Sequence, residues 1–289
     1  MCRFVAYLGE PILAEDLLTK PRNSLIHQSY DAQEAAEPLN GDGFGLGWYT
    51  KQIRDEPGLF RSITPAWNNQ NLKVNAGIMK SNCFLAHVRA ATEGGVSLEN
   101  SHPFRYNQYL MMQNGGVEGF KEIKRALINK LDDQFYQWIE GQTDSEHVFA
   151  LYMQVVAAVA REKKAIDLPL RVLSNCFKEA FHIIEEIKKE KAVGGPSVYN
   201  MVISDGRRLV ATRYSTDPDN CSRTLYFARG KKYVCEGNHC HMLPLDGGPG
   251  SILVVSEKLD EYVDEWIPVE DNHALLVNED LTYELVNLE

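Results

Sequence analysis

The sequence predicts an α+β fold, in which helices and strands occupy separate stretches of the chain. Strand patterns come first, two long helical patterns follow between residues 143 and 191, and strand patterns return after Gly194-Gly195-Pro196. Segregated runs of this kind indicate that sheets and helices lie in separate layers. The chain has 289 residues, of which 44% are hydrophobic and 24% charged, and this suits one large core or at most two domains.

The N-terminal part of the chain is predicted to form strands. β-branched and aromatic residues begin directly after Cys2, and residues 40–49 are a glycine-dense turn that leads into a strand. Residues 83–89 resemble a buried strand that ends in polar groups. Residues 109–113 resemble another strand, and a turn is expected at the Asn114-Gly115-Gly116 that follows.

The middle of the chain is predicted to be helical. Thr143-Asp-Ser-Glu146 has the capping-box pattern, and an apolar series with helical spacing follows it to Val159. A second long helix is predicted over residues 168–191. A shorter helix is indicated by apolar residues at helical spacing, namely Phe120, Ile123, Leu127 and Leu131.

The C-terminal part returns to strand patterns. Residues 199–204 and 208–213 flank Asp205-Gly206, which is typical of a hairpin. Further strands are predicted over residues 225–228, 252–255 and 274–277.

Composition excludes several classes of function. No run of about 18 apolar residues occurs, and the opening residues are too short and too poorly framed for a secretory signal, so we expect no membrane association. The net charge of −10, with no basic stripe, argues against a nucleic-acid partner. A cytoplasmic protein is therefore expected.

The six cysteines are scattered through the chain, which predicts free thiols in a reducing compartment. The segment from Cys235 to His241 holds residue types that bind metals, including His239. Its spacing is irregular and no second Cys/His pair lies nearby, so we expect neither a metal nor another cofactor.

Cys2 is the first candidate for chemistry. Removal of Met1 would place a thiol and a free α-amine on one residue. Both groups ordinarily titrate within roughly two pH units of neutrality, so the amine can accept the thiol proton directly or through one water. This arrangement supplies a nucleophile and its base together.

Four further residues suit the cleavage of an amide that carries an amino-acid head. The side-chain amide of Asn114 and the backbone N–H of Gly115 can hold a developing oxyanion, although Asn-Gly is also a common turn. Arg89, at the end of a strand, offers a planar fork for a carboxylate. Asp144, in the first turn of a helix, offers a carboxylate for an ammonium or simply offsets the helix dipole.

Taken together, the motifs resemble the class II glutamine amidotransferases. Within them, the chain is similar to a stand-alone subgroup that includes the fungal glutathione-degradation amidohydrolase component and the bacterial ergothioneine-pathway amidohydrolase. The likeness runs over nearly the whole chain, and its motifs occur in the same order. They are Met1-Cys-Arg-Phe4, Asn40-Gly-Asp-Gly-Phe-Gly-Leu-Gly-Trp-Tyr49, Ala86-His-Val-Arg-Ala-Ala-Thr92, Ser101-His-Pro-Phe104, Asn114-Gly-Gly116, Thr143-Asp-Ser-Glu-His147 and Trp266-Ile-Pro-Val269 with Asn272-His273.

The resemblance implies a four-layer αββα N-terminal-nucleophile hydrolase fold over a single domain, residues 2–289, with Met1 removed. It places the nucleophile on Cys2, the oxyanion hole on Asn114 and Gly115, the substrate carboxylate at Arg89 and the ammonium at Asp144. It also implies a place for His102 near the site, among the substrate-binding residues, as a structural support that can also take a polar role. Two further residues, Asp42 and Thr92, are candidates for supporting roles.

Two positions depart from the pattern of these relatives. Gln113 stands where the subgroup usually has His before Asn-Gly, and Glu93 stands where the wider family often has His after Thr. Glutamine donates and accepts hydrogen bonds, but it cannot titrate.

The function implied is hydrolysis of a γ-glutamyl amide, such as glutamine, glutathione or a related compound, through a thioester on Cys2. A partner subunit or a homo-oligomer is also implied. Two alternatives stay open: a glutaminase subunit that delivers ammonia to a partner synthase, and a catalytically dead scaffold that binds γ-glutamyl compounds. A metal hydrolase that uses His239 and His241 is a third.

Overall fold

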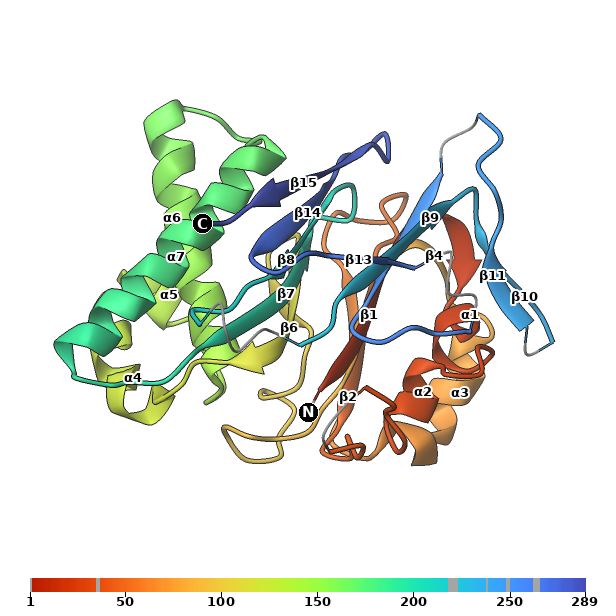
Figure 1. Cartoon of the computed structure of the whole chain (residues 1–289), viewed down its shortest axis with the longest axis horizontal. Helices are drawn as coiled ribbons and strands as arrows, with labels where there is room; N and C mark the ends of the chain where they lie inside the picture. The colour runs from red at the N-terminus through yellow and green to blue at the C-terminus, as the bar shows by residue number, and fades with distance from the viewer. Residues whose placement is uncertain (1, 35–36, 218–222, 238, 248–249, 262–265) are drawn as a thin grey trace.

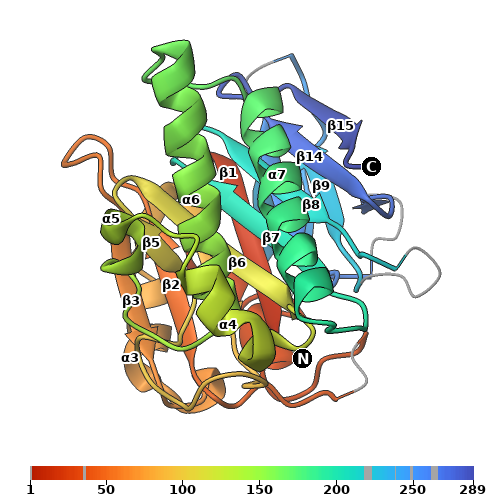
Figure 2. The same cartoon turned by 90° about the vertical axis from the view of Figure 1, so that its left-hand side faces the viewer.

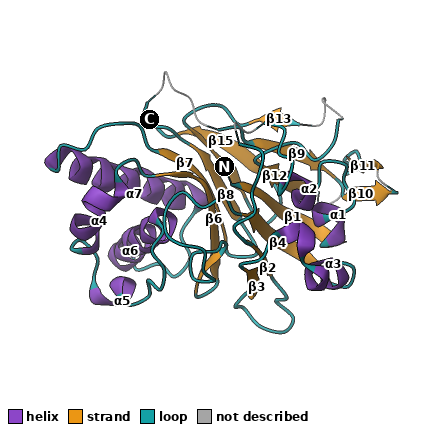
Figure 3. Ribbon diagram, turned by 90° about the horizontal axis from the view of Figure 1, so that it is seen from below, coloured by secondary structure: helices purple, strands orange, loops and turns teal. Residues whose placement is uncertain are grey.

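The computed structural model describes residues 2–34, 37–217, 223–237, 239–247, 250–261 and 266–289. Within these residues, two antiparallel sheets are stacked face to face, and helices cover the outer face of each (Figure 1). Figure 3 shows the same layers from below, with α4 to α7 on one side and α1 to α3 on the other. The predicted α+β class and the αββα arrangement are therefore confirmed.

The first sheet carries the N-terminal strand at its centre. β1 pairs with β4 on one side and with β12 on the other, and its residues from Arg3 to Leu8 are buried between the second sheet and the helices α1 to α3. The strand order is β13 (Ile267–Pro268), β9 (Tyr226–Gly230), β12 (Ser251–Val255), β1 (Arg3–Leu13), β4 (Lys80–Val88), β2 (Phe44–Trp48) and β3 (Gly58–Ser62).

The second sheet has β6 and β7 near one edge, where they pair through the Asn114-Gly115 segment. Its order is β15 (Tyr283–Asn287), β14 (His273–Val277), β8 (Leu209–Arg213), β7 (Val198–Ser204), β6 (Tyr109–Gly116) and β5 (Phe104–Tyr106). A separate hairpin joins β10 (Tyr233–Glu236) to β11 (His239–Met242).

Two long helices cover the outer face of the second sheet (Figure 2). They are α6 (Asp144–Lys163) and α7 (Leu170–Glu190), accompanied by the shorter α4 (Phe120–Ile128) and α5 (Asp133–Tyr136). The other sheet is covered by α1 (Glu15–Leu18), α2 (Leu25–Gln28), the 3-10 turn Ala66–Asn68 and α3 (Gln70–Ala76).

The alternation of side chains along each central strand fills separate cores. In β1, Phe4 and Ala6 face the space between the two sheets, whereas Val5 and Tyr7 face α1 to α3. In β6, Met112 faces the space between the sheets and Met111 faces the long helices. This period of two is the general rule for strands, and it places the side chain of Gln113 on the opposite face of β6 from that of Asn114.

Three predictions about local structure need correction. The strand β6 does not end at Asn114, because it stays paired with β7 as far as Gly116, and the turn follows there. Leu131 lies beyond the end of α4 at Ile128. Thr143 does cap α6, since its hydroxyl accepts from the Glu146 N–H at 3.3 Å, but the Glu146 carboxylate instead accepts from the backbone of residues 140 and 141.

The prediction of six free thiols is wrong for one pair. Cys235 and Cys240 form a disulfide, because β10 and β11 place them directly opposite each other. Cys2, Cys83 and Cys176 are free, and Cys221 lies outside the described residues, as does Met1. The described residues contain no group of three His, Cys, Asp or Glu side chains that could hold a metal ion. Within the same ranges, no helix is long and apolar enough to cross a membrane.

Candidate active site

Cys2 lies directly before β1, at the edge where β4 ends. Its Sγ is 3.4 Å from the backbone N–H of Ala90, which donates to it, and 3.4 Å from the Ala90 carbonyl oxygen. The register of β1 with β4 explains this contact. Arg3 stands opposite Val88 in an antiparallel pair, so Cys2, which precedes Arg3, lies beside the residues that follow Val88. The thiol is half-buried.

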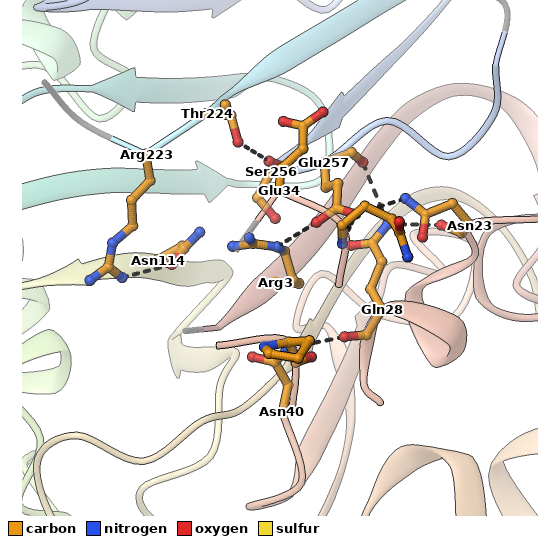
Figure 4. Close-up of polar contacts among 12 residues, drawn as sticks. Arg3, Asn23, Gln28, Glu34, Asn40, Asn114, Arg223, Thr224, Ser256 and Glu257 are labelled. Atoms are coloured by element: carbon orange, nitrogen blue, oxygen red, sulfur yellow. Dashed lines mark hydrogen bonds and ion pairs between the residues drawn. The ribbon is translucent and has the colours of Figure 1, made fainter. Parts of the chain in front are cut away.

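A buried ion pair holds the backbone of Cys2. Arg3 donates from Nη1 to the Cys2 carbonyl oxygen at 2.9 Å. Its Nε lies 2.9 Å from Oε2 of Glu257 (Figure 4). The second carboxylate oxygen of Glu257 accepts from Nδ2 of Asn23 at 3.0 Å and from the Gln33 N–H at 2.6 Å. The backbone of Cys2 is thus held by residues that are far apart in the sequence.

Asn114 lies near the end of β6, with its side chain fully buried. Its Oδ1 accepts from Nη1 of Arg223 at 2.9 Å, whereas its buried Nδ2 has no hydrogen-bond partner among the described residues (Figure 4). A buried N–H without a partner costs free energy, and the cost is recovered when an acceptor arrives. The amide is therefore prepared to donate to a ligand.

Gly115 follows on β6, opposite Tyr199 of β7. A Cβ atom there would lie 2.0 Å from the carbonyl oxygen of Val198, which is backbone and cannot move without opening the sheet. The glycine is required by this close approach of two strands, rather than by a turn.

The side chain of Gln113 lies on the opposite face of β6 from Asn114, because neighbouring residues of a strand alternate. Its Nε2 donates to the Val198 carbonyl oxygen at 3.3 Å, and its backbone oxygen accepts from Nε2 of His87 at 3.1 Å. The departure from His at this position thus falls on the helix side of the sheet, away from Cys2.

Arg89 comes directly after β4, and its side chain is buried. Its guanidinium donates to the carbonyl oxygens of Glu93, Gly94 and Gly95, at 2.9, 3.4 and 3.1 Å. Burial lowers the pKa of Arg89, and the nearby Cys2, Asp42 and Asp144 act in the opposite direction. A carboxylate ligand would add the missing counter-charge.

Asp144 occupies the first turn of α6 and is buried. Its Oδ2 accepts from the Val117 N–H and its Oδ1 from the Ser145 N–H, each at 2.8 Å. Desolvation raises the pKa of this carboxyl above its ordinary value, and these two hydrogen bonds oppose that shift. An ammonium ligand would favour the charged form.

The three supporting candidates lie in different surroundings. Asp42 accepts from the Ala91 N–H at 2.8 Å and so fixes the loop after Arg89, whereas Thr92 is exposed. His102 is buried and stacks on His87, with ring centres 4.2 Å apart. Neither of its ring nitrogens has a hydrogen-bond partner among the described residues, and burial lowers its pKa well below the ordinary value. Burial therefore keeps this imidazole in its neutral form.

No sequence pattern pointed to Arg3, Glu257 or Arg223. Arg3 stood inside a quoted motif, but nothing local marks it as the partner of a residue 254 positions away. Arg223 lies in a polar stretch without periodicity, and only the fold brings it to Asn114.

Comparisons with known proteins show the family and the fold of this chain. The family description "Glutamine amidotransferases class-II" matches residues 19–229. The chain is 37% identical to the "Probable glutamine amidotransferase DUG3" of Saccharomyces cerevisiae, over 96% of this chain and 82% of that protein. It is also 37% identical to the γ-glutamyl-hercynylcysteine sulfoxide hydrolase of Mycolicibacterium smegmatis, over 41% of this chain and 52% of the relative.

Two solved structures share the fold. A glutamine aminotransferase class-II domain protein from Silicibacter pomeroyi superposes with a TM-score of 0.66 at 24% identity, covering 99% of each chain. A glutamine phosphoribosylpyrophosphate amidotransferase from B. subtilis superposes with a TM-score of 0.61 at 15% identity, covering 100% of this chain and 49% of that one. Family match, fold and relatives agree, and the chain belongs to the class II glutamine amidotransferases, enzymes that act on amide bonds.

Proposed function

We propose that this protein hydrolyses γ-glutamyl amides, with Cys2 as the nucleophile once Met1 has been removed, and that residues 2–289 form the single catalytic domain. The observation that carries the proposal is the carboxamide of Asn114. Its Nδ2 is buried without a partner, while its Oδ1 is held by Arg223. Such a donor suits a carbonyl oxygen that gains negative charge.

In the first step, the Cys2 α-amine takes the thiol proton and the thiolate attacks the γ-carbonyl carbon. The carbonyl oxygen becomes an oxyanion, which accepts from Nδ2 of Asn114 and from the N–H of Gly115. The C–N bond then breaks, and the leaving amine takes the proton from the Cys2 ammonium. The product is a γ-glutamyl thioester.

In the second step, the Cys2 amine takes a proton from water while the hydroxide adds to the thioester carbonyl. The C–S bond breaks, the thiolate regains its proton and glutamate is released. The same two donors hold the second oxyanion, so one preorganised site serves both halves of the reaction.

Arg89 and Asp144 would bind the amino-acid head of the substrate. Both are buried and within electrostatic range of each other, and the cation and the anion match the α-carboxylate and the α-ammonium of a γ-glutamyl group. The name of the Mycolicibacterium relative includes a γ-glutamyl substrate, which supports this assignment.

The leaving group is drawn from glutamine, glutathione and related γ-glutamyl compounds. The proposal includes a cytoplasmic location. It also includes a protein partner or self-association, and light scattering of the purified protein would reveal the self-association. The location and the association are expectations from the sequence that the family match alone does not test.

The test is glutamate release by the Met1-less protein, with the N-terminus verified by mass. Glutamine, glutathione and other γ-glutamyl amides are offered to the wild type, to Cys2→Ala and to Cys176→Ala, which removes a buried thiol of α7. We expect release by the wild type and by Cys176→Ala only. Asn114→Ala should lose about 100- to 1000-fold in turnover.

Equal release by Cys2→Ala would refute the nucleophile. No release from any amide, with no labelling of Cys2 by a γ-glutamyl chloromethyl ketone, would favour the scaffold alternative. Labelling without release would favour a subunit that needs a partner.

A further inference from the structure

The side chain of Arg223 contacts one end of the Asn114 carboxamide. The guanidinium has only donors, so the atom that it approaches at 2.9 Å must be the amide oxygen. Nδ2 therefore points away from Arg223, and it is the atom left without a partner among the described residues. Without the arginine, the amide could rotate and present its oxygen, which would repel an oxyanion.

The backbone of Arg223 is itself held in place. Its carbonyl oxygen accepts from Nδ2 of Asn200 at 2.7 Å and from Nε of Arg213 at 3.2 Å. Asn200 stands directly opposite Asn114 in the pairing of β6 with β7. The same pair of strands thus carries the amide and anchors the residue that orients it.

The charge of Arg223 also faces the site. Burial lowers the pKa of its guanidinium, and Cys2 and Asp144 are the acidic groups near enough to oppose that shift. In the part of the chain that the structure describes, the guanidinium makes no ion pair with a carboxylate, and Asn114 is its side-chain partner. A desolvated cation without a carboxylate partner stabilises negative charge that develops nearby.

We propose that Arg223 is a positioning residue for the proposed amide hydrolysis, and the idea rests on that function. It holds the Asn114 amide with its NH2 group toward the reacting carbonyl oxygen. By donating to Oδ1, it also polarises the amide and makes the N–H a stronger donor as the oxyanion forms, since hydrogen bonds in series strengthen one another. Arg223 acts on the substrate through Asn114.

The test is a double-mutant cycle with Arg223→Gln, Asn114→Ala and the pair. Removing a charged hydrogen-bond partner costs about 1.5–3 kcal/mol, so Arg223→Gln should lower kcat by about 10- to 150-fold and change KM little. In the Asn114→Ala background, Arg223→Gln should change kcat less than about 2-fold. Arg223→Lys should restore part of the loss, because it keeps the charge but not the planar fork.

Arg207→Gln, at a partly exposed arginine in the turn between β7 and β8, is the control and should keep wild-type kcat. Thermal unfolding of all variants separates a loss of positioning from a loss of folding. Additive losses in the cycle would overturn the proposal, because they would mean that Arg223 contacts the substrate or the thiol directly. A wild-type kcat for Arg223→Gln would overturn it as well.

A second readout does not depend on turnover. In asparagine-labelled protein, the side-chain NH2 signals of Asn114, assigned by their loss in Asn114→Ala, should shift in Arg223→Gln and stay unchanged in Arg207→Gln. Unshifted signals would refute the contact whether or not the enzyme is active. If the wild type neither releases glutamate nor labels at Cys2, the proposed function fails, and the NMR result still decides the role of Arg223 in orienting the amide.

Discussion

The guanidinium of Arg3 pairs with the carboxylate of Glu257 across 2.9 Å, and the two side chains are only 2% and 1% exposed. Arg3 also donates to the Cys2 carbonyl oxygen, so the pair joins the backbone of Cys2 to the segment after β12. Removing one partner of a buried pair leaves the other charged and desolvated, which is far more costly than removing both.

We therefore expect Glu257→Ala to lower the free energy of unfolding by about 3–5 kcal/mol, measured by urea denaturation. The matched control is Glu261→Ala, which breaks the exposed pair of Arg22 with Glu261. This variant should change the free energy of unfolding by less than about 1 kcal/mol. Similar losses in the two variants would contradict the structural role of the buried pair.

Gly115→Ala tests the close approach of β6 and β7. The added Cβ would meet the Val198 carbonyl group, so the two strands must separate near the site. Overpacking of this kind costs about 1–3 kcal/mol or more, and glutamate release should fall with it. Gly194→Ala is the control, since nothing lies within 4 Å of its added Cβ. A melting temperature unchanged in Gly115→Ala would refute the constraint.

Asp144→Asn tests the binding of an ammonium. A charged hydrogen bond contributes about 1.5–3 kcal/mol, so kcat/KM for a γ-glutamyl amide should fall by about 10- to 150-fold. An N-acetylated substrate lacks the ammonium, and the variant should discriminate against it much less than the wild type does. Equal discrimination by both enzymes would exclude Asp144 from this role.

The same residue predicts an acid limb in the pH profile. Burial raises the pKa of Asp144 above its ordinary value. As the pH falls, its carboxylate is therefore protonated at a higher pH than that of an exposed aspartate. The kcat/KM of the wild type should decline there, whereas Asp144→Asn should lack this limb. Persistence of the limb in the variant would assign it to another group.

His87 predicts a loss of stability in acid. Burial lowers its pKa from 6.5 to about 3, so the unfolded chain takes up a proton before the folded one does. Its contribution is complete above pH 6.5 and is lost as pH falls from 6.5 toward 3, by about 1.4 kcal/mol per pH unit. His87→Gln, which keeps an N–H for the Gln113 carbonyl, should flatten the pH dependence of unfolding free energy between pH 6.5 and 5. The control His182→Gln, at an exposed histidine, should leave this pH dependence unchanged.

Local patterns predicted most of the elements that frame the site. Thr143 caps α6, and Asp205-Gly206 forms the turn between β7 and β8, because a cap and a turn depend on neighbours in sequence. The short strands β3, β5, β13 and β15 were not predicted, since they acquire their partners only in the sheets. For the same reason, the Asn114-Gly115-Gly116 segment was expected to turn, although β7 keeps it extended.

By itself, the sequence determined the α+β class, the family and the residues proposed for the chemistry, Cys2, Asn114, Gly115, Arg89 and Asp144, because ordered motifs are local strings of residues. Only the tertiary structure decided that Arg3 pairs with Glu257, that Arg223 donates to Asn114 and that Gln113 and Asn114 lie on opposite faces of β6. These relations join residues across two stacked sheets, where contact depends on strand register and on which face a side chain occupies. Neither is written in a local pattern.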